Sequence, residues 1–149
     1  MRIAILNGPN LNLLGRREPT IYGTRSMEQV LLDIQRTYPD VYLEYHQSNH
    51  EGVLIDWVQE LGVLCSGQEL DGIVLNAGGY THTSVALRDA VACSQVPVVE
   101  VHVSDITARE DFRRVSLMSD VCAHTIMGHG VDGYLEGVEW IIKQTSGNK

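Results

Sequence analysis

The stretch Val98-Val99-Glu100-Val101-His102-Val103 decides the fold, because it is a strand-length run whose first four residues are near-continuously apolar, interrupted only by Glu100. Strands of a parallel sheet that is covered on both faces read as near-continuous apolar runs, whereas strands with one wet face alternate. The stretch therefore predicts a strand of a parallel sheet. Further runs of strand type occur at Arg2 to Leu6, Val41 to His46, Gly72 to Asn76 and Ala123 to Gly128.

The segments between these five runs are long enough for helices. Helices are expected at Ser26 to Tyr38, Glu51 to Cys65, Thr83 to Ser94 and Gly133 to Gln144, with Ser26 (paired with Gln29) and Thr83 as N-terminal caps. A shorter helix is expected near Thr107. Because short crossovers between parallel strands are right-handed, this pattern favours a doubly wound α/β sandwich. We predict one five-stranded parallel sheet with the strand order 2-1-3-4-5.

The composition indicates one domain, residues 1–149, in a reducing compartment. No Pro- or Ser-rich linker divides the 149 residues. Met1 leads directly into a strand-like run without a basic start, a long apolar stretch or a cleavage site, so we expect a cytoplasmic protein that does not contact membranes. Cys65, Cys93 and Cys122 are odd in number and widely spaced, which favours neither disulfides nor a zinc site. No other metal-ligand spacing appears.

The charge pattern favours a small anionic ligand. Nineteen acidic residues against eleven basic ones give a formal net charge of −8, which disfavours binding to nucleic acid and to anionic membranes. Basic residues nevertheless gather in two loops, at Arg16 and Arg17 and at Arg109, Arg113 and Arg114. Of these, Arg16 and Arg114 are expected to be solvated surface residues.

Two familiar kinds of site are disfavoured. The only lysines, Lys143 and Lys149, lie near the C-terminus, which excludes a Schiff base with a carbonyl substrate. The run Gly128-His129-Gly130-Val131-Asp132-Gly133 matches a dinucleotide-binding pattern, but only sixteen residues follow it, too few for the second strand and its acidic residue. We expect an ordinary turn into the last helix.

Polar residues follow the strands that flank the predicted switch point. In doubly wound sheets, ligands bind beyond the carboxyl ends of the strands where the strand order reverses, here between the first and third strands. The residues at these ends are Asn7 and Asn10, Asn76-Ala77-Gly78-Gly79, and His102-Val103-Ser104. Gly78 and Gly79 fit either a close backbone approach to a ligand or a plain tight turn. We expect a polar, uncharged pocket floor.

Glu100 and His102 form the first candidate catalytic pair. They alternate with Ser104 on one face of the fourth strand, so a carboxylate lies next to the imidazole and can orient and charge it. A histidine in an apolar strand is commonly a packed core residue, but its position at the carboxyl end favours function. The remaining histidines outside this region, His46, His50, His124 and His129, are expected to be structural.

The loop of about residues 8–25 is the second candidate region. It exceeds the usual connection of about 4 to 6 residues, and its glycines and prolines are expected to break any helix or strand between Leu6 and Ser26. Its leucines and Ile21 supply apolar contacts, so we expect a lid over the active site rather than disorder.

Tyr22 in this loop is the candidate base. An ordinary phenol with a pKa near 10 needs about 4 kcal/mol to ionise at pH 7. One arginine at about 4 Å supplies roughly that much at an effective dielectric constant of about 20. Arg17 and Arg113 are the arginines expected to do so.

Long motifs in a fixed order cover nearly the whole chain. They are N-G-P-N-L-N-L-L-G-R-R-E-P-x-x-Y-G from residue 7, Q-S-N-H-E-G from residue 47, L-N-A-G-G-Y-T-H-T-S-V-A-L-R-D-A from residue 75, E-V-H-V-S-D from residue 100 and A-R-E-D-F-R-R from residue 108. The set resembles the type II 3-dehydroquinate dehydratases. This resemblance implies a flavodoxin-like fold and a lyase (hydro-lyase) that dehydrates 3-dehydroquinate to 3-dehydroshikimate through an enolate, without metal or organic cofactor. The reaction is the third step of the shikimate pathway of aromatic amino acid biosynthesis.

The resemblance also implies roles for individual residues. Tyr22 matches the base that removes a C2 proton, and Arg17 matches the residue that lowers its pKa. His102, backed by Glu100, matches the acid that protonates the departing C1 hydroxyl. Asn10 matches a residue that holds a water against the enolate oxygen.

Further matching positions imply substrate binding and assembly. The substrate contacts would come from Asn76, His82, Val103, Ser104 and Arg113. Asp89 matches a residue that reaches the site of a neighbouring subunit, which implies trimers assembled into a homododecamer, a tetramer of trimers.

Three other hypotheses remain open. The same reaction also serves quinate catabolism. A non-catalytic module that binds small hydroxy acids, or a structural oligomer that keeps only the fold, would use the same architecture. Neither of these needs Tyr22, Arg17 and His102 together, and all three residues are present.

Overall fold

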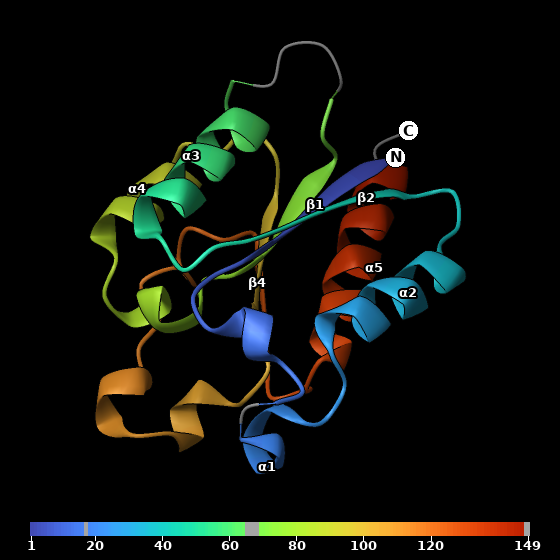
Figure 1. The fold of residues 1–149 in the computed structure, drawn as a ribbon. Coiled ribbons are helices and arrows are strands. Elements are labelled where there is room, and N and C mark those ends of the chain that lie inside the picture. The colour runs from blue at the N-terminus through green and yellow to red at the C-terminus, as the bar shows by residue number, and fades with distance from the viewer. Residues whose placement is uncertain (17, 65–68, 148–149) are drawn as a thin grey trace.

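A computed structural model describes residues 1–16, 18–64 and 69–147. Five parallel strands form one sheet in the order β2-β1-β3-β4-β5, which confirms the predicted order. The strands are β1 (Arg2–Asn7), β2 (Tyr42–Gln47), β3 (Gly72–Asn76), β4 (Val98–His102) and β5 (His124–Met127). All five carboxyl ends therefore lie at one edge of the sheet, the lower end in Figure 1.

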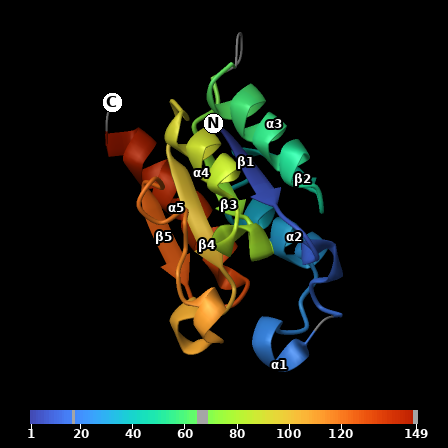
Figure 2. The same cartoon turned by 90° about the vertical axis from the view of Figure 1, so that its left-hand side faces the viewer.

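Helices cover both faces of this sheet. They are α2 (Met27–Thr37), α3 (Glu51–Gly62), α4 (Val85–Ala92) and α5 (Asp132–Gly147). Helices α2 and α5 pack together on one face, and α3 and α4 pack together on the other (Figures 1 and 2). The result is the predicted α/β sandwich. Among the described residues, no helix combines the length and the apolar character needed to cross a membrane.

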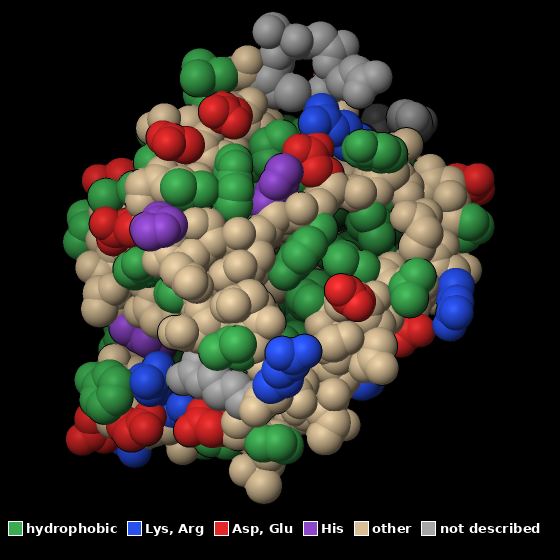
Figure 3. All heavy atoms as spheres, viewed as in Figure 1, with side chains coloured by type: hydrophobic (Ala, Val, Ile, Leu, Met, Phe, Trp, Pro, Cys, Tyr) green, Lys and Arg blue, Asp and Glu red, His purple; other side chains and the backbone are tan. Residues whose placement is uncertain are grey.

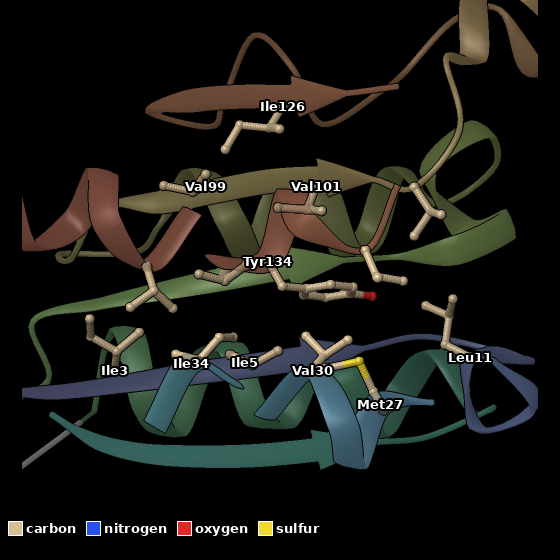
Figure 4. Packing of buried hydrophobic residues seen from close by; sticks show 14 of the residues in the cluster. Ile3, Ile5, Leu11, Met27, Val30, Ile34, Val99, Val101, Ile126 and Tyr134 are labelled. Carbon is tan, nitrogen blue, oxygen red and sulfur yellow. The ribbon is translucent and has the colours of Figure 1, made fainter. Parts of the chain in front are cut away.

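Two apolar clusters hold the three layers together. Ile3 and Ile5 of β1 point to the α2 and α5 side, whereas Ala4 and Leu6 point to the α3 and α4 side. All four side chains are fully buried. Because successive residues of a strand alternate between two covered faces, the strands can be apolar at nearly every position. Figure 4 shows the first cluster, with Tyr134 of α5 at its centre.

The helix starts follow the predicted capping chemistry with one correction. Ser26 and Gln29 form a complete capping box at the start of α2, as predicted. The cap of α4 is Ser84, whose Oγ accepts from the Leu87 N–H at 2.9 Å, and not Thr83. Thr83 instead follows the preceding 3-10 helix, Gly78–His82, as its C-terminal cap, so α4 begins only at Val85.

The expectation that no helix would form between Leu6 and Ser26 is wrong in detail. A 3-10 turn forms at Leu11–Leu13, and a four-residue helix, α1, at Pro19–Tyr22. Proline suits the first helical turn because its φ is already fixed and its missing N–H needs no partner there. Gly23, with φ 79°, ends the turn. After β4, 3-10 turns at Ile106–Ala108 and Asp111–Arg113 replace the short helix expected near Thr107.

The loops after β1 and β3 touch at the switch point. The Gly8 N–H donates to the Asn76 carbonyl at 2.8 Å. A Cβ on Gly8 would lie 2.5 Å from the Ala77 carbonyl oxygen, a distance that real Cβ atoms do not reach. Glycine is therefore required at position 8 for this approach, which fixes the positions of the residues beyond both strands.

Candidate active site

A cavity of about 150 Å³ lies at the carboxyl ends of β1, β3 and β4, where the topology predicts a site. Its walls bring together the predicted residues Asn10, Tyr22, Asn76, His82, His102, Val103, Ser104 and Arg113. Figure 3 shows basic side chains gathered at this lower end of the molecule, although acidic ones lie among them.

Two predicted residues that the structure describes do not line the cavity, and a third is outside the described residues. Glu100 is buried behind His102 and is 1% exposed. Asp89 is exposed on α4, away from the cavity walls. Arg17 lies outside the described residues, as does Cys65, the expected end of α3. Among the residues that the structure describes, no three His, Cys, Asp or Glu side chains form a group that could hold a metal ion.

Glu100 and His102 form the pair that their spacing predicts. Glu100 and His102 are two positions apart on β4, so their side chains project to the same side of the sheet. His102 Nε2 lies 2.5 Å from Glu100 Oε1. An ionised carboxylate only accepts hydrogen bonds, so Nε2 carries the proton of this contact. His102 also lines the cavity, and its other ring nitrogen, Nδ1, is therefore the one available to exchange a proton with a ligand.

Three hydroxyl groups complete the surroundings of Glu100. Ser116 donates to Oε1, while Ser119 and Thr125 donate to Oε2 at 2.6 and 3.0 Å. Burial raises the pKa of Glu100, but the hydrogen bond and charge of His102, with the serine hydroxyls, outweigh burial and lower it. Glu100 is thus a carboxylate held in its anionic form inside the protein, next to the His102 ring.

Tyr22 is paired with an arginine that the sequence reasoning did not select. Arg109 Nη1 donates to the Tyr22 hydroxyl at 3.2 Å and to Ser104 Oγ at 3.0 Å. Its guanidinium carbon lies 5.7 Å from the Tyr22 ring centroid. The hydrogen bond to Tyr22 raises the pKa of Arg109, which is therefore a permanent cation at this position.

The second arginine of this loop, Arg113, also lines the cavity. Its Nε lies 3.1 Å from Glu110 Oε2, and Arg109 Nε lies 3.7 Å from the same oxygen. Glu110 is half-exposed at 54%, so water screens its charge. The cavity wall therefore keeps a positive character suited to an anionic ligand, as the clustering of basic residues predicts.

Asn10 and His82 are held by contacts outside the cavity. Asn10 adopts a left-handed conformation with φ 68°, and its N–H donates to Asn49 Oδ1 at 3.0 Å. His82 Nδ1 lies 2.8 Å from the Val115 carbonyl, so Nδ1 carries a proton. The Nε2 atom of His82 is left for the cavity that this residue lines.

Sequence reasoning missed Arg109, Asn49 and the three hydroxyls around Glu100. Arg109 belongs to the predicted basic cluster, so its charge was a signal, but its partner depends on how the loop after β4 turns back toward α1. Asn49 lies in the quoted Q-S-N-H-E-G motif. The hydroxyls carry no motif signal, since Ser116, Ser119 and Thr125 come from separate segments that meet only in the fold.

Comparisons with known proteins agree with this geometry. The family model described as dehydroquinase class II matches residues 1–142. A 3-dehydroquinate dehydratase of Halothermothrix orenii is 47% identical over 143 residues, which are 95% of this chain and 93% of that protein. One of Marinomonas sp. is 47% identical over 142 residues, 94% of this chain and 95% of that protein.

Solved structures give the same result. The type II dehydroquinase of Butyrivibrio crossotus has a TM-score of 0.87 to this chain at 41% identity, covering 95% of this chain and 97% of its own. That of Propionibacterium acnes has a TM-score of 0.86 at 33% identity, covering 95% and 96%. This chain belongs to the class II dehydroquinase family.

Proposed function

We propose that this protein dehydrates 3-dehydroquinate to 3-dehydroshikimate through an enolate intermediate. One observation carries the proposal: a single small cavity is lined by a phenol that is hydrogen-bonded to an arginine and by an imidazole that is hydrogen-bonded to a buried carboxylate. An elimination next to a ketone needs one group to take a proton from carbon and another to give a proton to the departing hydroxyl. The two pairs meet these two needs.

Tyr22 is the proposed base. As a phenolate it takes the C2 proton, and the electron pair of the C–H bond moves onto the ketone oxygen to give the enolate. The Arg109 guanidinium, 3.2 Å from the phenol oxygen, stabilises the negative charge of the base. Arg17 is proposed to add a second positive charge near the Tyr22 oxygen. This part of the proposal rests only on the resemblance of its motif to that of the type II 3-dehydroquinate dehydratases.

His102 is the proposed acid. When the enolate collapses, the C1–O bond breaks, and His102 supplies the proton that lets the hydroxyl leave as water. The anionic Glu100 stabilises the charged ring before this transfer and fixes its orientation. The reaction is redox-neutral and needs no co-reactant.

Other cavity residues are proposed to bind and orient the substrate. Asn10 is proposed to hold a water against the enolate oxygen. The substrate carboxylate and hydroxyls are proposed to contact Asn76, His82, Arg113 and the backbone N–H groups of Val103 and Ser104. Each of these residues lines the cavity, which supports this assignment.

The remaining features are proposed from the family resemblance. We propose that the chain acts as a single catalytic domain whose loop, about residues 8–25, closes over the substrate. Asp89, exposed on α4, is proposed to reach the site of a neighbouring subunit in a trimer, with four trimers forming a homododecamer. We propose a cytoplasmic enzyme of the shikimate pathway; the same chemistry would serve quinate catabolism.

Two variants test the assignment of base and acid. Tyr22→Phe should abolish turnover while the protein still folds and binds substrate, because only the ionisable oxygen is lost. His102→Ala should form the enolate but fail to expel water, so exchange of the C2 proton with solvent should continue without product. Unchanged turnover in purified Tyr22→Phe, or full activity in His102→Ala, would overturn the corresponding role.

A non-catalytic module for small hydroxy acids is the second candidate function. The cationic wall formed by Arg109 and Arg113 would suit such a ligand equally well. A binding module, however, has no use for a carboxylate that is buried behind a histidine and saturated with hydroxyl donors. Wild-type protein that binds 3-dehydroquinate without converting it would favour this second function.

A further inference from the structure

Tyr134 is a buried polar residue that the proposed mechanism does not use. It comes from α5, has no exposed surface and lies among aliphatic side chains of the sheet and of α2. In Figure 4 its hydroxyl points along the strands toward their carboxyl ends, on the side of Leu11. Buried tyrosine hydroxyls need partners, since leaving one unpaired costs about 1–3 kcal/mol.

The partners of this hydroxyl are two asparagines at the switch point. Asn7 of β1 and Asn76 of β3 are register neighbours at the carboxyl ends of the two central strands, and both are buried. Tyr134 Oη lies 2.9 Å from Asn7 Oδ1 and 2.9 Å from Asn76 Nδ2. Asn76 lines the cavity, whereas Asn7 does not. The hydroxyl thus connects a cavity residue to the core behind it.

The direction of each hydrogen bond follows from the donors present. The Gly78 N–H, which can only donate, lies 3.1 Å from the Asn76 oxygen and therefore fixes which end of that carboxamide is the oxygen. The Asn76 nitrogen must then face Tyr134 and donate to it. The single proton of the hydroxyl is left for the Asn7 oxygen.

This arrangement determines what Asn76 offers to a ligand. Its oxygen is occupied by Gly78, and one of its two N–H bonds is occupied by Tyr134. The second N–H remains for the cavity. Asn76 therefore presents a donor that is suited to a hydroxyl or carboxylate oxygen.

We propose that Tyr134 is a positioning residue that holds the Asn76 carboxamide with its N–H toward the substrate. This inference rests on the proposed function, because Asn76 is a proposed contact of the substrate of that reaction. A donor to an oxygen that does not change charge binds ground state and transition state equally. Its loss raises KM and leaves kcat unchanged.

The test is Tyr134→Phe, which removes only the hydroxyl, with Tyr45→Phe as the matched control. Tyr45 is half-buried and meets the network only at its far end, where Asn7 Nδ2 lies 3.5 Å from its hydroxyl. We expect KM for 3-dehydroquinate to rise about tenfold in Tyr134→Phe, with kcat within about twofold, and no change in Tyr45→Phe. A fall in kcat with unchanged KM would overturn the proposal.

The same substitution in an Asn76→Ala background separates positioning from general structural damage. If Tyr134 acts through Asn76, its hydroxyl has nothing left to position, and the double variant should show the KM of Asn76→Ala alone. If Tyr134→Phe raises KM in the Asn76→Ala background by the same factor as in the wild type, Tyr134 acts independently of Asn76, and the proposal is overturned.

Neutron diffraction from deuterated wild-type crystals tests the same point without any variant or turnover. Deuterium on Asn76 Nδ2 directed at Tyr134 Oη, and the Tyr134 deuteron directed at Asn7, would support the proposal. A Tyr134 deuteron directed at Asn76 would overturn it. Absence of turnover in the wild type would instead overturn the proposed function, while the deuterium positions still decide the orientation of Asn76.

Discussion

Arg109 provides the sharpest test of the electrostatics of the site. Its side chain is only 16% exposed and its Nη1 lies 3.2 Å from the Tyr22 hydroxyl oxygen. Unit charges at this distance interact with about 5 kcal/mol at an effective dielectric constant of about 20. Arg109→Met removes this charge but keeps much of the volume. If water that enters the vacated space recovers half of this stabilisation of the Tyr22 phenolate, the variant still loses about 2.5 kcal/mol. A loss of this size in the free energy of the transition state lowers kcat about 70-fold.

The assay is the steady-state conversion of 3-dehydroquinate, with circular dichroism to confirm folding. Arg109→Lys keeps a charge but loses the guanidinium Nη1 that donates to both Tyr22 and Ser104, so we expect a smaller loss of about tenfold. Arg36→Met, which removes an equal charge at a side chain that is 78% exposed, is the matched control and should keep full activity. A folded Arg109→Met with kcat within about threefold of the wild type would refute the reasoning.

Three further predictions concern stability and reactivity. Because the pKa of Glu100 lies below its ordinary 4.5, its stabilising charge is present above pH 4.5 and is lost as the pH falls through the folded-state value. The urea midpoint of the wild type should therefore fall more steeply below about pH 5 than that of Glu100→Gln. Gly8→Ala should lower the free energy of unfolding by about 1–3 kcal/mol in urea titrations, since its Cβ would meet backbone 2.5 Å away. Burial raises the pKa of Cys122 to about 12, so iodoacetamide at pH 8 should label it only after unfolding, as mapped by mass spectrometry.

The glycine and cysteine predictions each have a control within the same chain. Gly52, in α3, has no atom within 4 Å of an added Cβ, so Gly52→Ala should stabilise the protein by about 0.5–1 kcal/mol. A Gly8→Ala variant as stable as the wild type would contradict the close approach at the switch point. Exposed Cys93 should react with iodoacetamide in the folded protein, and equal labelling of Cys122 would contradict its burial. Parallel acid titrations of wild type and Glu100→Gln would contradict the lowered pKa of Glu100.

The sheet could be predicted from the sequence because its strands obey a local rule. Residues such as Ile3, Ala4, Ile5 and Leu6 are all buried, and only a strand with both faces covered allows this. The right-handed crossovers favoured a doubly wound sheet, of which 2-1-3-4-5 is one of the common strand orders. The short helix at Pro19–Tyr22 could not be predicted in the same way, because its single turn is set by packing of the loop and not by any repeat of apolar positions.

The site was predictable as far as the chain topology determines it. His102 and Asn76 meet because the carboxyl ends of neighbouring parallel strands lie at one edge of the sheet. Arg109 is different, because its contact with Tyr22 spans 87 positions and depends on the path of two irregular loops. Tyr134 lies in none of the quoted motifs, and its role as a hydrogen-bonding partner of Asn76 appears only when α5 is docked on the sheet.

The most direct test of the central claim uses purified, metal-stripped protein and 3-dehydroquinate, with the ultraviolet absorbance of the conjugated product as the readout. The measurement is repeated after borohydride treatment, which traps any Schiff base. We predict turnover that survives both treatments, because the proposed proton transfers need only Tyr22, His102 and their partners. A folded protein that binds 3-dehydroquinate and forms no product would contradict the account.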